Sequence, residues 1–305
     1  MCLNKKTPDS NSVITEQFLT MKDGAKIFTV IYDGGFDRTL LLVHGGPGAS
    51  CDYFRYQAEL LSQHINVVLF DERGVRRSDP INQENFDFQI LIDDMDDIRK
   101  ALNIDKWSVL GHSFGGLLTL LYATKYSDDI ESVIFECPSF CNTDTTDYIV
   151  KAIRNKLLEH GYNDFDAELA QAQEGGVASL WSLIGKIPGH VISEIYHPFP
   201  RDGITESFDS QAFTDEEQQK TQVHCGLVVN DSYANENHFR KLEQLSVPAL
   251  LMIGEYDVVC SPKQQEAFSN RVLKGQVIIL PNCGHTLHSE IPLKFVETVL
   301  DFLSQ

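Results

Sequence analysis

The sequence predicts an α/β fold, in which a mostly parallel central sheet is flanked by helices and a mainly helical segment is inserted. Short runs that are apolar on both faces alternate with stretches of helical periodicity, which is the pattern of βαβ units. The alternation stops over residues 139–242 and then resumes. The 305 residues, of which 42% are apolar, suffice for one large domain with an insertion or for two small domains.

The predicted strands begin with a hairpin and continue as a parallel series. Residues 17–20 and 26–32 flank the turn signal Lys22-Asp23-Gly24, which predicts two antiparallel strands. Six later strands are predicted at residues 39–43, 67–70, 107–110, 132–135, 249–253 and 276–280. Because these runs are apolar on both faces, we expect them to be buried in a parallel sheet with right-handed connections.

Helices are predicted from apolar residues that recur at spacings of three and four. One helix runs from Phe88 to Leu102, and four aspartates are expected on the face opposite its apolar stripe. These are Asp93, Asp94, Asp96 and Asp97. A final helix opens at Pro292, a residue that is favoured in the first helical turn. Within the insertion, residues 148–158 and 166–172 have helical periodicity.

The composition excludes several classes of function. The formal net charge of −19 argues against nucleic-acid binding, because nothing offsets the repulsion from phosphates. No run reaches the roughly 18–20 apolar residues of a membrane span, and no secretory signal is visible at the start. The seven cysteines are scattered, so we expect reduced thiols and a cytoplasmic location. The absence of HExxH, GxxxxGKS/T and GxGxxG motifs predicts neither a metal nor a nucleotide cofactor.

The strongest motif is Gly111-His112-Ser113-Phe114-Gly115, which lies between a predicted strand and a predicted helix. In this setting a GxSxG sequence is typical of the sharp turn that exposes a nucleophilic serine. Side chains at the two glycine positions would collide with the neighbouring strand and helix. We therefore predict Ser113 to be the nucleophile of a serine hydrolase with the α/β-hydrolase fold.

A serine nucleophile needs a general base, which is oriented by an acid. In this fold the chain order is Ser, then Asp or Glu, then His. His285 follows the last predicted strand and Asp257 follows the strand before it, so both are expected beside Ser113. Two alternatives remain, namely His288 as the base and Glu136 as the acid.

The second motif is HGGPG at residues 44–48, directly after a predicted strand. An oxyanion hole in this fold uses the N–H after the nucleophile and another from the loop after that strand. We therefore predict the N–H groups of Phe114 and Gly46 as its donors.

Structural roles are expected for several neighbours of these motifs. His44 is expected to support its loop, and Asp71 and Arg73 are expected to form a charge pair that orders theirs. The side chain of His112 is expected to point away from the triad.

The motifs together resemble those of the proline iminopeptidase family of serine peptidases. They are HGGPG at 44–48, DERG at 71–74, GHSFGG at 111–116, GEYD at 254–257 and NCGH at 282–285. The resemblance covers roughly residues 25–138 and 243–305. It implies release of an N-terminal residue, often proline, from peptides, and a helical cap whose acidic side chains hold the α-amino group.

The cap carries no motif that matches this family. We expect residues 1–138 and 243–305 to form the catalytic domain and residues 139–242 the mainly helical cap. Open α/β sheets bind ligands at the carboxyl edge that such a cap would cover. Val258 stands where some relatives have an amine-binding glutamate, and Phe114 stands where many have tryptophan. The carboxylates that are candidates to bind the α-amino group of the substrate are Glu194, Glu206, Asp231 and Glu236.

Three functions follow from these motifs. The first is an aminopeptidase that acts on a short peptide through an acyl-enzyme. The second is a carboxylesterase, lactonase or amidase that uses the same triad on a small molecule. The third is a binding protein that keeps the scaffold with little turnover. Carboxylates between Ser113 and the cap would indicate an amine substrate, and an apolar lining would indicate an ester.

Overall fold

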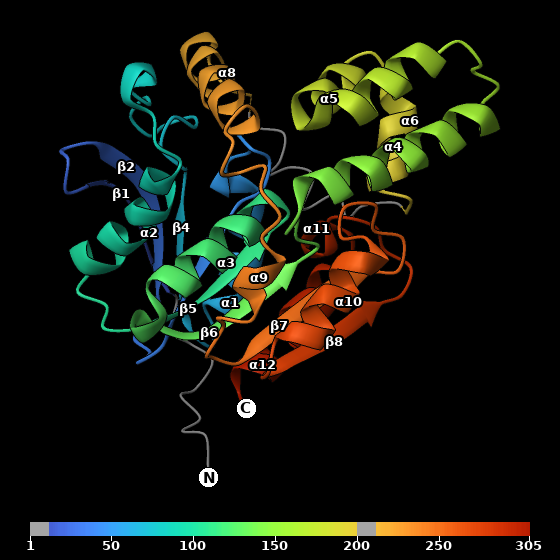
Figure 1. The fold of residues 1–305 in the computed structure, drawn as a ribbon. Coiled ribbons are helices and arrows are strands. Elements are labelled where there is room, and N and C mark those ends of the chain that lie inside the picture. The colour runs from blue at the N-terminus through green and yellow to red at the C-terminus, as the bar shows by residue number, and fades with distance from the viewer. Residues whose placement is uncertain (1–11, 200–211) are drawn as a thin grey trace.

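The protein is built around an eight-stranded sheet, with a group of helices beyond one end of its strands (Figure 1). The structure is a computed structural model that describes residues 12–199 and 212–305. The strands are β1 Val13–Thr20, β2 Lys26–Asp33, β3 Thr39–Val43, β4 Asn66–Phe70, β5 Trp107–His112, β6 Ile130–Glu136, β7 Ala249–Gly254 and β8 Gly275–Leu280.

The strand order across the sheet is β1-β2-β4-β3-β5-β6-β7-β8. β1 and β2 form the predicted antiparallel hairpin, and β2 also pairs antiparallel with β4. The pairs from β4 to β8 are parallel. The predicted mostly parallel sheet is therefore confirmed, and all the predicted strands are present with differences at their ends.

The burial predicted for the last strand was wrong. Val277 and Ile279 of β8 are 38% and 58% exposed. β8 lies at the end of the strand order, beside β7, so helices do not cover it on both faces. An apolar run does not reveal whether a strand is central or at an edge.

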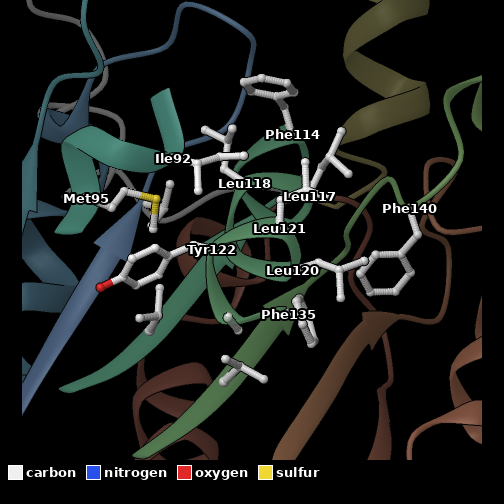
Figure 2. Close-up of a cluster of buried hydrophobic side chains, with 14 of the residues drawn as sticks. Ile92, Met95, Phe114, Leu117, Leu118, Leu120, Leu121, Tyr122, Phe135 and Phe140 are labelled. Carbon is white, nitrogen blue, oxygen red and sulfur yellow. The ribbon is translucent and has the colours of Figure 1, made fainter. Parts of the chain in front are cut away.

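Helices cover both faces of the sheet. Leu41 and Val43 of β3 point into a core shared with α2 and α3, and Leu40 and Leu42 point into a core shared with α1 and α12. The helices outside the insertion are α1 Arg55–Leu61, α2 Gln89–Ala101, α3 Phe114–Lys125, α10 Pro262–Arg271, α11 Leu287–Glu290 and α12 Pro292–Leu303. Short 3-10 helices span Cys51–Phe54, Gln83–Asn85 and Ser127–Asp129. Figure 2 shows side chains of α2 and α3 that pack together in the first of these cores.

Two of the four aspartates of α2 are buried rather than on a solvated face. Asp94 accepts hydrogen bonds of 2.9 and 2.6 Å from Arg73, and Asp96 accepts bonds of 3.1 and 2.9 Å from Arg99. Burial raises the pKa of Asp94 to about 6. The helix face opposite the apolar stripe is therefore partly buried, and arginines pair with its buried aspartates.

The insertion is mainly helical, as predicted. Its helices are α4 Asn142–Glu159, α5 Asp166–Ile184, α6 Gly189–Tyr196, α8 Asp215–Val229 and α9 Phe239–Leu242. The helices α4, α5 and α6 share a small core, which includes Ile153, Leu169 and Val191 and which Val259 joins from the loop after β7. The division into a catalytic domain and a cap of residues 139–242 stays a prediction. Among the described residues, no helix has the length and apolar character needed to cross a membrane.

The helix α5 is broken at Gly176, whose φ of 67° and ψ of −156° are not helical. Glycine adopts such a positive φ without the steric penalty that other residues incur. After the break, Val177, Leu180, Trp181 and Ile184 recur at helical spacing and form one face of the second half of the helix.

Candidate active site

Ser113 lies in the sharp turn between β5 and α3. Its φ of 55° and ψ of −118° are unusual for a residue with a side chain. A Cβ at Gly111 would overlap with Gly115, and a Cβ at Gly115 would overlap with the backbone of His44. The glycines of the motif therefore allow the turn to pack tightly between its neighbours.

The structure brings the three predicted triad residues together in a hydrogen-bonded series. His285 Nδ1 lies 2.7 Å from Asp257 Oδ1, and His285 Nε2 lies 3.0 Å from Ser113 Oγ. The backbone N–H groups of Val259 and Cys260 donate to the two oxygens of Asp257 at 3.2 and 2.8 Å. These bonds hold the carboxylate so that His285 donates from Nδ1 and presents Nε2 to the serine hydroxyl.

The two alternative residues pair with each other instead. Glu136 Oε1 accepts hydrogen bonds from the backbone N–H and from Nδ1 of His288, at 2.9 and 2.8 Å. Both residues are buried. The carboxylate that is hydrogen-bonded to His285, the predicted base, is therefore Asp257.

Burial raises the pKa of Glu136 to about 7 from its ordinary value of 4.5. At pH values between these two pKa values, Glu136 keeps its proton in the folded protein but has released it in the unfolded chain. Stability therefore falls as the pH rises through this range. Between pH 4.5 and 7, we expect the free energy of unfolding of wild type to fall by up to roughly 3 kcal/mol relative to that of Glu136→Gln. Urea unfolding of both proteins at pH 5 and pH 8 measures this difference. Parallel pH profiles of the two proteins would contradict the assignment.

The two predicted oxyanion donors flank the serine. Phe114 is the first residue of α3, where an N–H has no intrahelical acceptor. Gly46 has a φ of 125°, and a Cβ there would lie 2.5 Å from Gly48 N and 2.8 Å from Ala49 N. Both residues line the same cavity as Ser113. Their role as donors stays a prediction.

The prediction that His112 points away from the triad was wrong. Its ring centroid lies 4.7 Å from that of His285, and its Nε2 lies 3.1 Å from the His285 carbonyl oxygen. The loop that carries His285 contacts the end of β5, where His112 is the last residue. The side chain of His112 therefore lies against this loop rather than away from it. His112 lines the cavity too.

Asp71 and Arg73 are structural, but they do not pair with each other. Asp71 accepts hydrogen bonds from Arg77 at 2.7 Å and from Ser50 at 2.8 Å. Arg73 instead pairs with Asp94 and Asp23. A turn begins at Arg73, and the two side chains reach different partners. His44 supports this loop, because its Nε2 accepts the N–H of Glu72 at 3.1 Å.

A cavity of about 290 Å³ opens at Ser113 beneath the helices of the insertion. The second half of α5 supplies an apolar wall to it, and α4 supplies the polar but uncharged Asn142, Thr145 and Thr146. No carboxylate, ammonium or guanidinium group lines the cavity among the residues that the structure describes. The remaining lining residues are Gly46, Pro47, Ala49, Tyr53, His112, Phe114, Ser139, Ile149, Ile192, Tyr196, Val228, Val229, Val259 and His285.

Three of the carboxylates predicted to bind an amine lie away from the cavity lining. Glu194 pairs with His160 at 3.0 Å, Asp231 accepts the N–H of Ala234 at 2.8 Å, and Glu236 is exposed. Glu206 lies outside the described residues.

Sequence analysis did not single out Tyr53, which lines the cavity and follows the HGGPG loop. Its hydroxyl lies 3.1 Å from His112 Nδ1, and it accepts a hydrogen bond from the N–H of Gly45. The available signal was an aromatic residue with a polar tip close to a glycine-rich turn.

Two sets of three metal-ligating side chains converge near the triad. One set is His112, Glu136 and His288, and the other is Cys137, Asp257 and His285. Hydrogen bonds within the protein already engage members of both sets. We therefore assign neither set to a metal.

Comparisons with known proteins agree with this arrangement of the fold. The model of the alpha/beta hydrolase fold family matches residues 38–292. A proline iminopeptidase of Saccharolobus solfataricus is 26% identical over 290 residues, which cover 92% of this chain and 90% of that protein. This confirms the resemblance that the motifs indicate.

Solved structures of several enzymes share the fold. Proline iminopeptidase of Mycobacterium smegmatis superposes with a TM-score of 0.76 at 17% identity, covering 95% of this chain and 98% of that chain. An esterase from Exiguobacterium antarcticum gives a TM-score of 0.69 at 18% identity, covering 95% and 100%. From the family match over most of its length, the chain belongs to the alpha/beta hydrolase fold family.

Proposed function

We propose that the protein is a serine hydrolase in which Ser113, His285 and Asp257 form the catalytic triad. Ser113 Oγ attacks the substrate carbonyl carbon while its proton passes to His285 Nε2. The N–H groups of Gly46 and Phe114 stabilise the resulting oxyanion. Collapse of this intermediate expels the leaving group, which takes the proton from His285 and leaves an acyl-enzyme. Water then attacks the acyl-enzyme by the same steps and releases the acid.

The favoured substrate is an ester of a neutral, apolar carboxylic acid. The observation that supports this choice is the uncharged lining of the cavity at Ser113 over the described residues. Burying an ammonium group without a carboxylate partner costs several kcal/mol, so this lining disfavours a free α-amino group. The apolar face of α5 would instead contact the acyl chain. The esterase from Exiguobacterium antarcticum has the same fold.

A second candidate is an aminopeptidase that releases an N-terminal residue from a short peptide. The names of curated relatives and the HGGPG motif favour it. It requires a carboxylate within reach of the amine bound next to Ser113. Of the predicted candidates, Glu206 is the one whose position is not described.

A matched pair of substrates distinguishes the two candidates. The 2-naphthyl esters of cyclopentanecarboxylic acid and of proline share a leaving group and a five-membered ring, and they differ by the ring ammonium. We expect kcat/KM for the neutral ester to be at least about tenfold higher, because desolvating an unpaired ammonium costs several kcal/mol. We also expect prolyl-2-naphthylamide to be a poor substrate. A preference for the proline ester, together with turnover of the amide, would select the aminopeptidase.

The proposal includes no cofactor. A cytoplasmic location stays a prediction from the cysteine content.

A further inference from the structure

A chain of hydrogen bonds joins the HGGPG loop to the loop that carries His285. The N–H of Gly45 donates to Tyr53 Oη. Tyr53 Oη lies 3.1 Å from His112 Nδ1, and His112 Nε2 lies 3.1 Å from the carbonyl oxygen of His285. The chain therefore begins next to the predicted oxyanion donor Gly46 and ends on the backbone of the predicted base.

One arrangement of protons satisfies every bond in this chain. The carbonyl oxygen of His285 can only accept, so His112 carries its proton on Nε2 and accepts at Nδ1. The Tyr53 hydroxyl accepts from Gly45, and its one proton is donated to His112. Burial holds the pKa of His112 well below its usual value, so the ring stays neutral and keeps this arrangement.

Packing fixes the position of the Tyr53 hydroxyl. The ring of Tyr53 stacks on that of His288 with centroids 4.8 Å apart and an interplanar angle of 15°. It meets the ring of His112 edge-on, at 5.7 Å and 90°. His288 is itself held by two hydrogen bonds to Glu136. A hydroxyl on a ring held in this way has little freedom to follow a moving loop.

The glycine loop has equally little space. A Cβ at Gly45 would lie 3.0 Å from both His112 Nδ1 and Ser113 Cβ. The loop therefore lies directly on the serine turn. Its peptide groups are held by the bond from Gly45 N–H to Tyr53, and by contacts of Gly45 O with the N–H of Ala49 at 3.3 Å and with His44 Nδ1 at 3.0 Å. Rotation of the peptide groups around Gly45 would also turn the N–H of Gly46.

We propose that Tyr53 is a positioning residue for the oxyanion hole. Through Gly45 it helps to fix the direction in which the N–H of Gly46 points, in addition to the contacts that Ala49 and His44 make with Gly45 O, and His112 holds the Tyr53 hydroxyl in place. This role rests on the serine hydrolase mechanism proposed above. The structure thereby assigns a function to the His112–Tyr53 pair that involves no contact with the reacting atoms.

The variant Tyr53→Phe tests the proposal, because it keeps the stacked ring and removes the hydroxyl. An oxyanion donor acts in the transition state, and complete loss of one costs about 10²–10³ in kcat. A misdirected donor should cost less, so we expect kcat to fall about 10- to 100-fold with KM unchanged. The inhibition constant of a trifluoromethyl ketone, which forms a tetrahedral oxyanion on the serine, should rise by the same factor.

The matched control is Tyr126→Phe. This variant removes a hydroxyl that donates to Asp93 at 2.8 Å, and Tyr126 does not line the cavity. Its kinetics should equal those of wild type. Three results for Tyr53→Phe would overturn the proposal: a raised KM with normal kcat, a lowered melting temperature with normal kinetics, or loss of the native circular dichroism spectrum. The first would indicate substrate contact, and the others would indicate a role in stability.

Labelling of wild type by a fluorophosphonate separates this proposal from the mechanism on which it rests. An unlabelled wild type would contradict the serine hydrolase mechanism. A labelled wild type with normal turnover in Tyr53→Phe would contradict the positioning role alone. The ¹⁵N chemical shifts of His112 give a further check, because they should show a neutral ring protonated at Nε2.

Discussion

Replacing Ser113 with alanine is expected to lower kcat by about 10⁶-fold, the loss seen when a triad serine is removed from a serine protease. The hydroxyl 3.0 Å from His285 Nε2 is the proposed nucleophile, and no acyl-enzyme can form without it. The fold should survive, because the substitution removes one oxygen at the edge of a cavity. Initial rates on a naphthyl ester and thermal unfolding measure the two quantities.

Ser108→Ala is a suitable control for this experiment. Ser108 lies on β5, the strand that precedes Ser113, and its buried hydroxyl is hydrogen-bonded to that of Ser132 on β6 at 2.8 Å. Its activity should remain close to that of wild type. Covalent labelling by a fluorophosphonate should persist in Ser108→Ala and vanish in Ser113→Ala. A wild-type protein that neither reacts with the probe nor hydrolyses esters would favour the binding protein considered from the sequence.

Asp257→Asn is expected to lower kcat by about 10⁴-fold, as in serine proteases whose triad acid is changed to its amide. The N–H of Cys260 donates to one Asp257 oxygen at 2.8 Å and the N–H of Val259 to the other at the longer distance of 3.2 Å, so the shorter bond favours an asparagine whose oxygen faces Cys260. The amide nitrogen then faces His285 Nδ1 and donates to it. This stabilises the tautomer protonated on Nε2, which cannot accept the serine proton.

The matched comparison for the acid is Glu136→Gln. Glu136 pairs with His288, so this variant should change turnover by only a few fold. Activity of both variants is measured across the pH range, together with their unfolding curves. A severe loss in Glu136→Gln with near-normal turnover in Asp257→Asn would mean that the wrong acid is assigned to the triad.

The sequence predicts the proximity of the three triad residues because parallel strands end at one edge of a sheet. Ser113, Asp257 and His285 each follow the end of an apolar run, and β5, β7 and β8 lie in the same parallel part of the sheet. Glycines on both sides of Ser113 mark the turn as sharp. Local pattern and topology together therefore bring distant residues into contact.

The partners of side chains in the loops could not be predicted in this way. Arg73 pairs with Asp94 rather than Asp71, since its partner lies on a helix whose orientation is fixed by tertiary packing. His112 contacts His285 because a distant loop folds back over it. The exposure of β8 depends likewise on its place at the end of the sheet. These features arise from the packing of elements, which periodicity along one element does not describe.

The cavity lining was equally inaccessible from the sequence. Its wall comes from α4, α5, α6 and α8, together with loops of the sheet. Helical periodicity gives the apolar faces of these helices, but it does not tell which face meets the cavity and which meets a neighbouring helix.

The core that α4, α5 and α6 share has a consequence for how a hydrolase of the proposed kind can change during evolution. Residues such as Ile153, Leu169 and Val191 pack with one another and set where the broken half of α5 lies over Ser113. Substitutions among these three residues can change the shape of the cavity at Ser113. They can leave the hydrogen bonds that join Ser113, His285 and Asp257 intact. Under the proposed mechanism, substrate selectivity and the hydrolytic steps would therefore depend largely on different groups of residues, so a new substrate could be acquired while the triad is inherited unchanged.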